Sequence, residues 1–428
     1  MQKDRKLTNI VKFLLRLWNT GWFAFIWIWF YNNYVFDTWH RLGAAASILL
    51  FFILYNGCCR MYKAFSIVSS ETTEAIVSHA ISLVLADLVM LTQVVLISDS
   101  FRVQMFHFRF ANVLPGFLIC MLQILGSAAI IVFYKRYYIM HVAPNRTLLV
   151  YGKSRTYEEA LRFEERLLRK YRHLFVFADT LSEEEQGIGK AMDTCATVIL
   201  YDVDTRRRSE IIRECIRRHM PFYYTAGIPA ILNMGCEAKH LLDTPLLKYE
   251  YASHGTGRRR RKAILDRTMS ALLILLLSPL MLCTAGFLWV TEGRPVLEKE
   301  ERYTENGRVF RMLRFRTPKR SRPGLAERLH LDELPQLFNI LRGDMSFVGP
   351  RPERVEYVDA RCRELPEFRY RMSVKGGLTG YAQVFGTAQT STEDRLKLDL
   401  LYIENQSMAM DLRLLMLTVR SFFREKAR

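Results

Sequence analysis

The sequence is poor in cysteine for its length, and its cysteines form no metal-binding pattern. Eight cysteines in 428 residues are too few for a disulfide scaffold. None belongs to a CxxC pair or a CxxC…HxxxH set, which argues against a zinc ribbon and indicates a reducing compartment. A small-residue cleavage site is also missing after the first apolar run, so we expect no signal peptide.

Apolar and basic residues are abundant instead. Half of the residues are hydrophobic and 12% are aromatic, which excludes a mainly disordered protein. A net charge of +18 suits either nucleic acid or an anionic membrane surface. Residues 1–140 hold 12 basic and 6 acidic side chains, residues 141–257 hold 17 and 16, and residues 258–428 hold 32 and 21. Because the excess lies where the apolar runs are, the membrane is the favoured interpretation.

Four long apolar stretches predict a four-helix transmembrane bundle in residues 1–140. They are Leu17–Tyr34, Leu42–Cys59, Ile76–Ser98 and Leu114–Tyr134. Each is close to the ~20 residues that a helix needs to cross a bilayer. Nine Lys and Arg residues flank one side and three flank the other, which predicts that both ends of the bundle face the cytoplasm. Asp87, within the third stretch, is given no catalytic role.

Residues 141–257 have the texture of a cytoplasmic Rossmann-like domain. Predicted strands at Thr147–Tyr151, Leu174–Ala178, Val198–Tyr201 and Phe222–Tyr224 alternate with helices at Tyr157–Tyr171 and Arg206–His219. A GxGxxG motif is absent, since only Gly152 follows the first strand. A module without a nucleotide is favoured over a dinucleotide site. Gly255–Lys262, which ends in five basic residues, is predicted to be a linker attracted to anionic lipid.

A fifth apolar segment, Ala271–Val290, is interrupted by Ser278 and Pro279. A proline inside a helix removes a hydrogen bond, and the Ser278 hydroxyl can satisfy a freed carbonyl. A fifth crossing would also place the charged C-terminal region outside the cell. We therefore predict a re-entrant helix at residues 264–290, broken at Ser278 and Pro279, with a kinked span as the alternative.

The C-terminal region holds residues suited to phosphoryl transfer. Asp332 and Glu333 offer a carboxylate nucleophile or base beside a ligand for Mg²⁺, although such a pair is also a common helix cap. Arg314, Arg316 and Arg351 carry forked cations that fit phosphate oxygens, with surface ion pairing as the alternative.

Taken together, the strings resemble a known family. In order along the chain they are Asp266, the Ser278-Pro279 break, LDELPQLFN from Leu331, GDMSFVGPRP from Gly343, TGYAQV from Thr379 and LDLLY from Leu398. From about Arg258 to Arg428 the chain resembles the bacterial sugar transferases, the monotopic phosphoglycosyl transferases. With four preceding spans and a Rossmann-like insert, the whole chain is similar to the large polyisoprenyl-phosphate hexose-1-phosphate transferases.

The resemblance implies transfer of a sugar-1-phosphate from a UDP-sugar to undecaprenyl phosphate, with release of UMP. Such a reaction would initiate exopolysaccharide, capsule or O-antigen assembly at the bacterial inner membrane. By position, Asp332 would form a covalent phosphosugar intermediate, Glu333 would bind Mg²⁺ or act as base, and Asp399 would be a further catalytic carboxylate. The same correspondence places Arg314, Arg316, Arg351 and Gln383 in substrate binding.

The predicted protein is thus a membrane protein of mixed α and α/β class. It has the transmembrane bundle, the Rossmann-like domain, and a mainly α catalytic domain at residues 258–428 that contains the re-entrant helix. Its expected partners are the UDP-sugar, undecaprenyl phosphate and membrane lipid, not nucleic acid, and a homodimer is left open. A non-catalytic scaffold or regulator of glycan assembly is the alternative function.

The sequence departs from the family pattern at several positions. The glutamine that usually follows the re-entrant helix is missing from Leu297–Arg302, Arg314 stands for a usual Lys, and Tyr381 for a usual Trp. Gly376-Gly377 replaces Pro-Gly, and His330 replaces a small residue. Because both dyad carboxylates, Arg351 and Asp399 are present, activity is still expected, whereas donor choice and rate are open.

Overall fold

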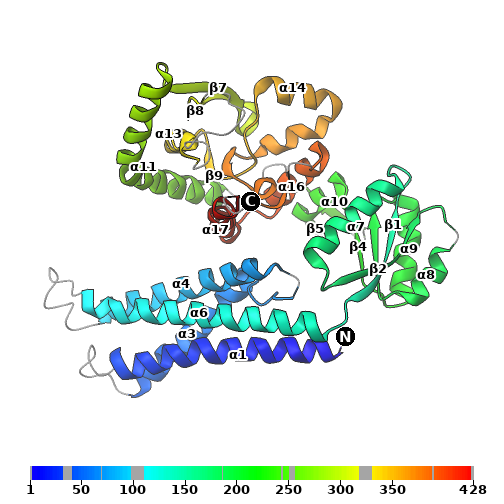
Figure 1. Ribbon diagram of the computed structural model, residues 1–428, viewed down its shortest axis with the longest axis horizontal. Helices are drawn as coiled ribbons and strands as arrows, with labels where there is room; N and C mark the ends of the chain where they lie inside the picture. The colour runs from blue at the N-terminus through cyan, green and yellow to red at the C-terminus, as the bar shows by residue number, and fades with distance from the viewer. Residues whose placement is uncertain are drawn as a thin grey trace. The chain divides into compact units, whose positions relative to one another are not determined.

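The computed structural model describes residues 2–31, 41–68, 70–97, 110–185, 187–241, 244–249, 256–317, 330–387 and 390–425. The chain divides into two compact units, Met1–Thr225 and Ala226–Arg428, which are described separately below (Figure 1). The predicted domain boundaries at 140 and 257 stay predictions. Residues 226–257 group with the second unit, where Ile228 and Ile231 belong to its core.

Four helices form the N-terminal bundle that the apolar runs predict. They are α1 (Gln2–Ile26), which continues as a π-helical turn at Trp27–Tyr31, α3 (Arg41–Met61), α4 (Thr72–Ile97) and α6 (Phe110–His141). The ends of two predicted runs, at Tyr34 and Ser98, lie outside the described residues. Buried Asn19 ties three helices together, because its Nδ2 donates to the Tyr55 hydroxyl at 3.0 Å and to Ser127 Oγ at 2.9 Å.

Length and composition make this a membrane protein. Within the described residues, four segments are long and apolar enough to cross a bilayer: Ala44–Met61, Thr72–Gln93, Leu114–His141 and Arg259–Thr291. The first three lie in the bundle and the fourth lies in the second unit. Helix α1 does not meet the same criterion over its described part, although Phe23 and Trp27 are buried in the bundle core.

A parallel α/β module follows α6, as predicted. Its elements are β1 (Asn145–Tyr151), α7 (Tyr157–Tyr171), β2 (Phe175–Ser182), α8 (Ile188–Thr194), β3 (Thr197–Tyr201), α9 (Thr205–Arg217) and β4 (Phe222–Tyr224). The four strands pair in the order β2-β1-β3-β4 and are all parallel. The predicted strands and both predicted helices are confirmed. The short α8 was not predicted, because its seven residues show no amphipathic period long enough to detect.

The sheet is covered on both faces, which explains why its strands are continuously apolar. Residues Leu148 and Leu200 pack with α8 and α9 through Met192, Ile211 and Cys215. Their neighbours in the strands, Leu149 and Ile199, pack on the opposite face with Ala160 and Leu167 of α7. Consequently α7, which follows β1, and α9, which follows the adjacent strand β3, lie on opposite faces of the sheet.

Within the described residues, the second unit combines helices with three two-stranded sheets. Its elements are α10 (Ile228–Leu232), η2 (Asn233–Gly235), β5 (Glu237–Leu241), β6 (Thr244–Lys248), α11 (Thr256–Glu292), β7 (Leu297–Tyr303), η3 (Glu305–Gly307), β8 (Val309–Phe315), η4 (Leu331–Glu333), α13 (Gln336–Arg342), β9 (Ser346–Val348), α14 (Val355–Glu364), η5 (Pro366–Ser373), β10 (Gly377–Thr379), α15 (Tyr381–Phe385), α16 (Thr392–Glu404) and α17 (Met408–Glu425). Strands β7 and β8 form an antiparallel pair, β5 pairs with β6, and β9 pairs with β10 in parallel.

Helix α11 is assigned as helix throughout, yet it bends along its length in Figure 1. Pro279 lies inside it and cannot donate to the carbonyl of Leu275 four residues earlier. The Ser278 hydroxyl donates to that carbonyl at 2.8 Å, as the sequence predicted. The re-entrant path itself stays a prediction.

The expectation of a linker at Gly255–Lys262 is wrong for residues 256–262, which begin α11. Arg and Lys are good helix formers, so a basic run need not be irregular. Two of its basic residues are engaged within the protein. Arg259 pairs with Glu305 at 3.0 Å, and Lys262 pairs with Asp411 of α17 at 2.5 Å.

Candidate active site

Asp332 lies in the short turn η4, between strand β8 and helix α13. The residue before η4, His330, has a left-handed backbone with φ of 52°, and the chain turns into η4 there. The Asp332 side chain is buried, with 4% exposure, and its Oδ2 accepts a hydrogen bond from Arg314 Nη2 at 2.7 Å. The predicted nucleophile and the predicted phosphate-binding arginine on β8 are therefore brought together.

The position of Arg314 is fixed by a buried side chain on α13. The Asn339 Oδ1 accepts the backbone N–H of Leu313 at 2.9 Å, and its Nδ2 donates to the carbonyl of Arg311 at 2.8 Å. These two bonds join α13 to β8 in the residues just before Arg314. The last residue of the LDELPQLFN string thus orients the cation that pairs with the aspartate near the start of the string.

One carboxylate oxygen of Asp332 is unpaired within the described residues. Its Oδ1 is buried and has no hydrogen-bond partner among the residues that the structure describes. Burial raises the pKa of Asp332, and the adjacent carboxylate of Glu333 raises it further, while the Arg314 guanidinium acts against both. Because most buried polar atoms in folded proteins are paired, the unpaired Oδ1 makes Asp332 a candidate for binding a ligand.

Glu333 and Arg351 lie at the more exposed side of the same site. Arg351 follows β9 in the Pro-Arg-Pro turn, and its Nη2 lies 3.7 Å from Glu333 Oε1. The Arg351 side chain is 52% exposed, so its guanidinium is accessible to a phosphate. Asp332, Glu333, Arg314 and Arg351 therefore form one group of two carboxylates and two forked cations.

Asp399 is linked to this group through a residue that the sequence did not single out. Arg371 of η5 is buried, and its Nη2 lies 2.9 Å from Asp399 Oδ2. The same nitrogen donates to the backbone carbonyl of Arg351 at 2.9 Å. Burial raises the pKa of Asp399, and the Arg371 guanidinium opposes that rise. Asp399 therefore helps to position the Pro-Arg-Pro turn through Arg371.

Two predicted substrate-binding residues are not joined to this group within the described residues. Arg316 lies one residue beyond β8 with an exposed side chain, and its backbone N–H donates to Val296. Gln383 is exposed on α15, where its Nε2 donates to the Leu378 carbonyl at 3.2 Å. Their predicted role in substrate binding stays a prediction.

The carboxylates fit Mg²⁺ in the way that this ion commonly binds. Within the described residues there is no cluster of three or more side chains that would enclose a metal ion. Mg²⁺, however, usually keeps several waters and takes only one or two carboxylates together with substrate phosphates. Asp332, with its unpaired Oδ1, and Glu333 are adjacent in η4 and offer carboxylates of this kind.

Comparison with known proteins gives a consistent result. Residues 257–425 match the family model described as bacterial sugar transferase. Over 239 residues the chain is 31% identical to the UDP-N-acetylgalactosamine-undecaprenyl-phosphate N-acetylgalactosaminephosphotransferase of Aeromonas hydrophila, covering 49% of this chain and 54% of that protein. It thus spans about half the length of that curated relative.

Two shorter relatives are covered more completely. The uncharacterized sugar transferase EpsL of Bacillus subtilis is 34% identical, over 37% of this chain and 85% of its own length. The UDP-glucose:undecaprenyl-phosphate glucose-1-phosphate transferase of Caulobacter vibrioides is 35% identical, over 38% of this chain and 69% of its own. From these matches we conclude that this chain belongs to the bacterial sugar transferase family.

Proposed function

We propose that the chain transfers a sugar-1-phosphate from a UDP-sugar to undecaprenyl phosphate and releases UMP. The observation that carries the proposal is the buried Asp332, whose Oδ2 is held by Arg314 and whose Oδ1 has no partner among the described residues. Relatives named as undecaprenyl-phosphate sugar phosphotransferases support the substrate classes. The product would be the first lipid-linked unit of an exopolysaccharide, capsule or O-antigen.

The proposed chemistry has two displacements at the same phosphorus. An oxygen of the ionised Asp332 attacks the β-phosphorus of the UDP-sugar, the bond to the bridging oxygen breaks, and UMP leaves. A phosphate oxygen of undecaprenyl phosphate then attacks that phosphorus. The bond to Asp332 breaks, and the carboxylate is regenerated with the sugar diphosphate on the lipid. Because Arg314 occupies Oδ2, the attacking atom is Oδ1.

The cations of the site have separate tasks in this scheme. Arg314 orients Asp332 and favours its ionised form. Arg351, being exposed, binds phosphate oxygens as their charge redistributes, with Arg316 and Gln383 as further contacts to the donor. Glu333 would hold Mg²⁺, which neutralises phosphate charge when bound, and Glu333 is the alternative base.

The proposed location is the cytoplasmic face of the bacterial inner membrane. An α11 that enters and returns on one face keeps the charged C-terminal unit beside both a lipid phosphate and a soluble nucleotide sugar. A cysteine introduced by Lys299→Cys, in a chain whose eight own cysteines are replaced, tests this topology. We expect an impermeant thiol reagent to label it only from the cytoplasmic side. Labelling from outside would mean that α11 crosses the bilayer.

The activity test is release of UMP from a panel of UDP-sugars with undecaprenyl phosphate and Mg²⁺ in detergent or nanodiscs. We expect release with at least one donor, and transfer of its sugar phosphate to the lipid. If every nucleotide sugar fails while the chain is folded, the enzyme proposal is wrong and the non-catalytic scaffold takes its place.

A further inference from the structure

The α/β module has a cavity at the place where such folds usually bind ligands. It has a volume of about 880 Å³ and lies at the carboxyl ends of the parallel strands, beyond β1 and β3. Helices α7 and α9 follow these two neighbouring strands and pack on opposite faces of the sheet, in two separate hydrophobic clusters. Open α/β sheets bind nucleotides at such a point, where free backbone N–H groups contact the phosphates.

In this chain a buried carboxylate occupies those N–H groups. Glu183 directly follows β2 and is 3% exposed. Its Oε1 accepts the backbone N–H of Lys153 in the turn after β1, and its Oε2 accepts that of Asp204 in the turn after β3, both at 2.8 Å. The Glu183 backbone is also bonded, since its N–H donates to Tyr151 and its carbonyl accepts Arg207 Nε, both at 2.9 Å.

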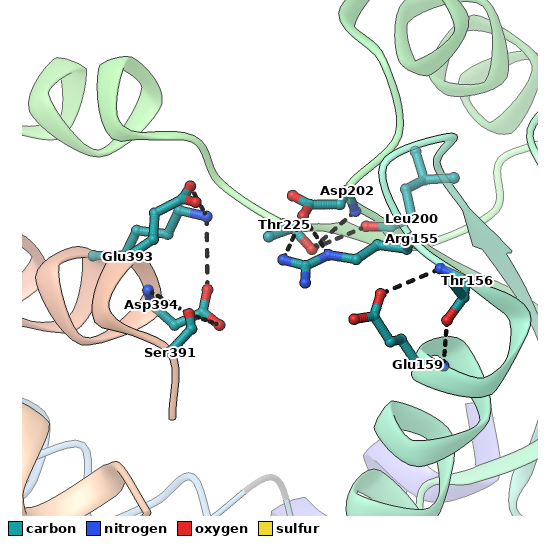
Figure 2. A network of polar contacts seen from close by, with 10 residues as sticks. Arg155, Thr156, Glu159, Leu200, Asp202, Thr225, Ser391, Glu393 and Asp394 are labelled. Carbon is teal, nitrogen blue, oxygen red and sulfur yellow. Dashed lines mark hydrogen bonds and ion pairs between the residues drawn. The ribbon is translucent and has the colours of Figure 1, made fainter. Parts of the chain in front are cut away.

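The helix ends beside the cavity are capped by their own side chains. At α7, the Thr156 hydroxyl accepts the Glu159 N–H, and the Glu159 carboxylate accepts the Thr156 N–H (Figure 2). At α9, Asp204 Oδ2 accepts the N–H of Arg206 at 3.0 Å. These donors are the ones that a pyrophosphate would otherwise use.

The two turns are also packed directly against each other at Gly152. A Cβ on Gly152 would lie 1.9 Å from the Asp202 carbonyl oxygen, so the backbone after β1 is packed directly on the backbone after β3. Asp202 is held there by Arg155, whose Nη2 lies 2.8 Å from Asp202 Oδ2, and by Thr225 (Figure 2). Gly152 therefore allows the two turns to contact each other, and does not serve close approach to a ligand.

The charge of the cavity wall is equally unfavourable for a nucleotide. Carboxylates outnumber cations among the lining side chains, which are Lys153, Ser154, Glu183, Glu184, Asp202, Asp204, Arg206, Arg207 and Glu210. Lys153 already pairs with Glu184 at 2.5 Å, and Arg207 pairs with Glu210 at 2.7 Å. A diphosphate in this cavity would face excess negative charge.

We propose that Glu183 is a built-in substitute for the phosphate of a nucleotide, and that it permanently closes this site. The module is therefore a Rossmann-type scaffold that binds neither a dinucleotide nor a second UDP-sugar. All nucleotide binding by the chain then resides in the C-terminal unit, which rests on the proposed function.

The test replaces Glu183 in the full chain and follows amide hydrogen exchange in peptides that contain Lys153 and Asp204. We expect Glu183→Ala to speed exchange there at least ~10-fold, because each N–H loses a charged acceptor. Inorganic phosphate at millimolar concentration should restore protection in the variant and change nothing in the wild type. Glu184→Ala is the matched control, since it removes the same charge from the exposed neighbouring residue.

Unchanged exchange in Glu183→Ala, or protection of the wild-type turns by NAD or UDP, would overturn the proposal. If the alanine variant does not fold, Glu183→Gln serves instead, because it keeps the shape and one acceptor oxygen and should release one N–H only. Failure of the proposed function is seen separately. UDP with Mg²⁺ would then protect no peptide of the C-terminal unit, whatever the two turns show.

Discussion

Two buried carboxylates of this chain, Glu183 in the α/β module and Asp332 in the C-terminal unit, differ in what their oxygens bind. They are almost equally buried, at 3% and 4% exposure. Both oxygens of Glu183 accept backbone N–H groups, whereas Asp332 uses Oδ2 for Arg314 and leaves Oδ1 unpaired among the described residues. Burial is thus shared by a structural and a reactive carboxylate, and unused hydrogen-bonding capacity distinguishes them.

Leaving the Oδ1 atom of Asp332 unpaired has an energetic cost. A buried acceptor without a partner destabilises a protein by about 1–3 kcal/mol. Natural chains keep such groups mainly at functional sites, where a substrate or ion supplies the missing partner. The comparison therefore predicts that Asp332 is replaceable for folding and essential for turnover, with the opposite true of a fully paired carboxylate.

The largest expected effect is on turnover, from Asp332→Asn. The amide keeps the shape of the side chain but is a far weaker nucleophile, so we expect UMP release to fall at least ~10⁴-fold. Intact-mass analysis of the wild type with donor alone should show one added sugar phosphate, and peptide mapping should assign it to the peptide that holds Asp332.

The control for this change is Asp344→Asn. Asp344 belongs to the same unit, pairs with Arg308 at 2.8 Å and is not part of the proposed machinery. It should retain activity within about twofold. Full activity of Asp332→Asn, or a sugar phosphate attached at another residue, would remove the basis of the comparison.

The next effect is on stability, and it concerns a carboxylate that is paired by charge. Asp399→Ala removes the closer carboxylate partner of the buried Arg371 guanidinium and leaves it Glu353 at 3.9 Å. We expect the opening free energy reported by the most protected amides of α16 to fall by about 3–5 kcal/mol. Asp359→Ala, at an exposed carboxylate that accepts from the Tyr303 hydroxyl, should change this free energy by less than ~0.5 kcal/mol. Equal effects would mean that the Asp399 pair does not support the fold.

Much of the architecture could be predicted because it follows from local patterns. The strands of the α/β module are continuous apolar runs between turns, and the bundle helices are long apolar stretches, so tertiary contacts were not needed to find them. The helix at 256–262 was not predicted, because a basic run is compatible with both a linker and a helix. The ion pairs of this segment with Glu305 and Asp411 are tertiary contacts.

The residues that the sequence did not reveal act through long-range contacts. Glu183 lies in the run Ser182-Glu183-Glu184-Glu185, which has the composition of a solvated loop, and only the sheet order brings it to the turns after β1 and β3. Arg371 lies in a polar stretch without periodicity, and its link to Asp399 joins η5 to α16. In the C-terminal unit, the dyad was found because its residues are adjacent in sequence.

The smallest expected effect is on the pH dependence, and it tests how Arg314 acts on Asp332. Burial and Glu333 raise the pKa of Asp332, and Arg314 lowers it. Arg314→Met should therefore raise that pKa, so that at a given acid pH more Asp332 is protonated and unable to attack. The acid limb of kcat/KM should move to higher pH by about one pH unit. Arg314→Lys keeps the charge and should move it little, and Arg316→Met, which removes a nearby exposed cation, should leave the limb in place whatever it does to KM. If Arg314→Met and Arg316→Met give the same limb, Arg314 does not tune the nucleophile, and the unpaired Oδ1 alone would have to account for the reactivity of Asp332.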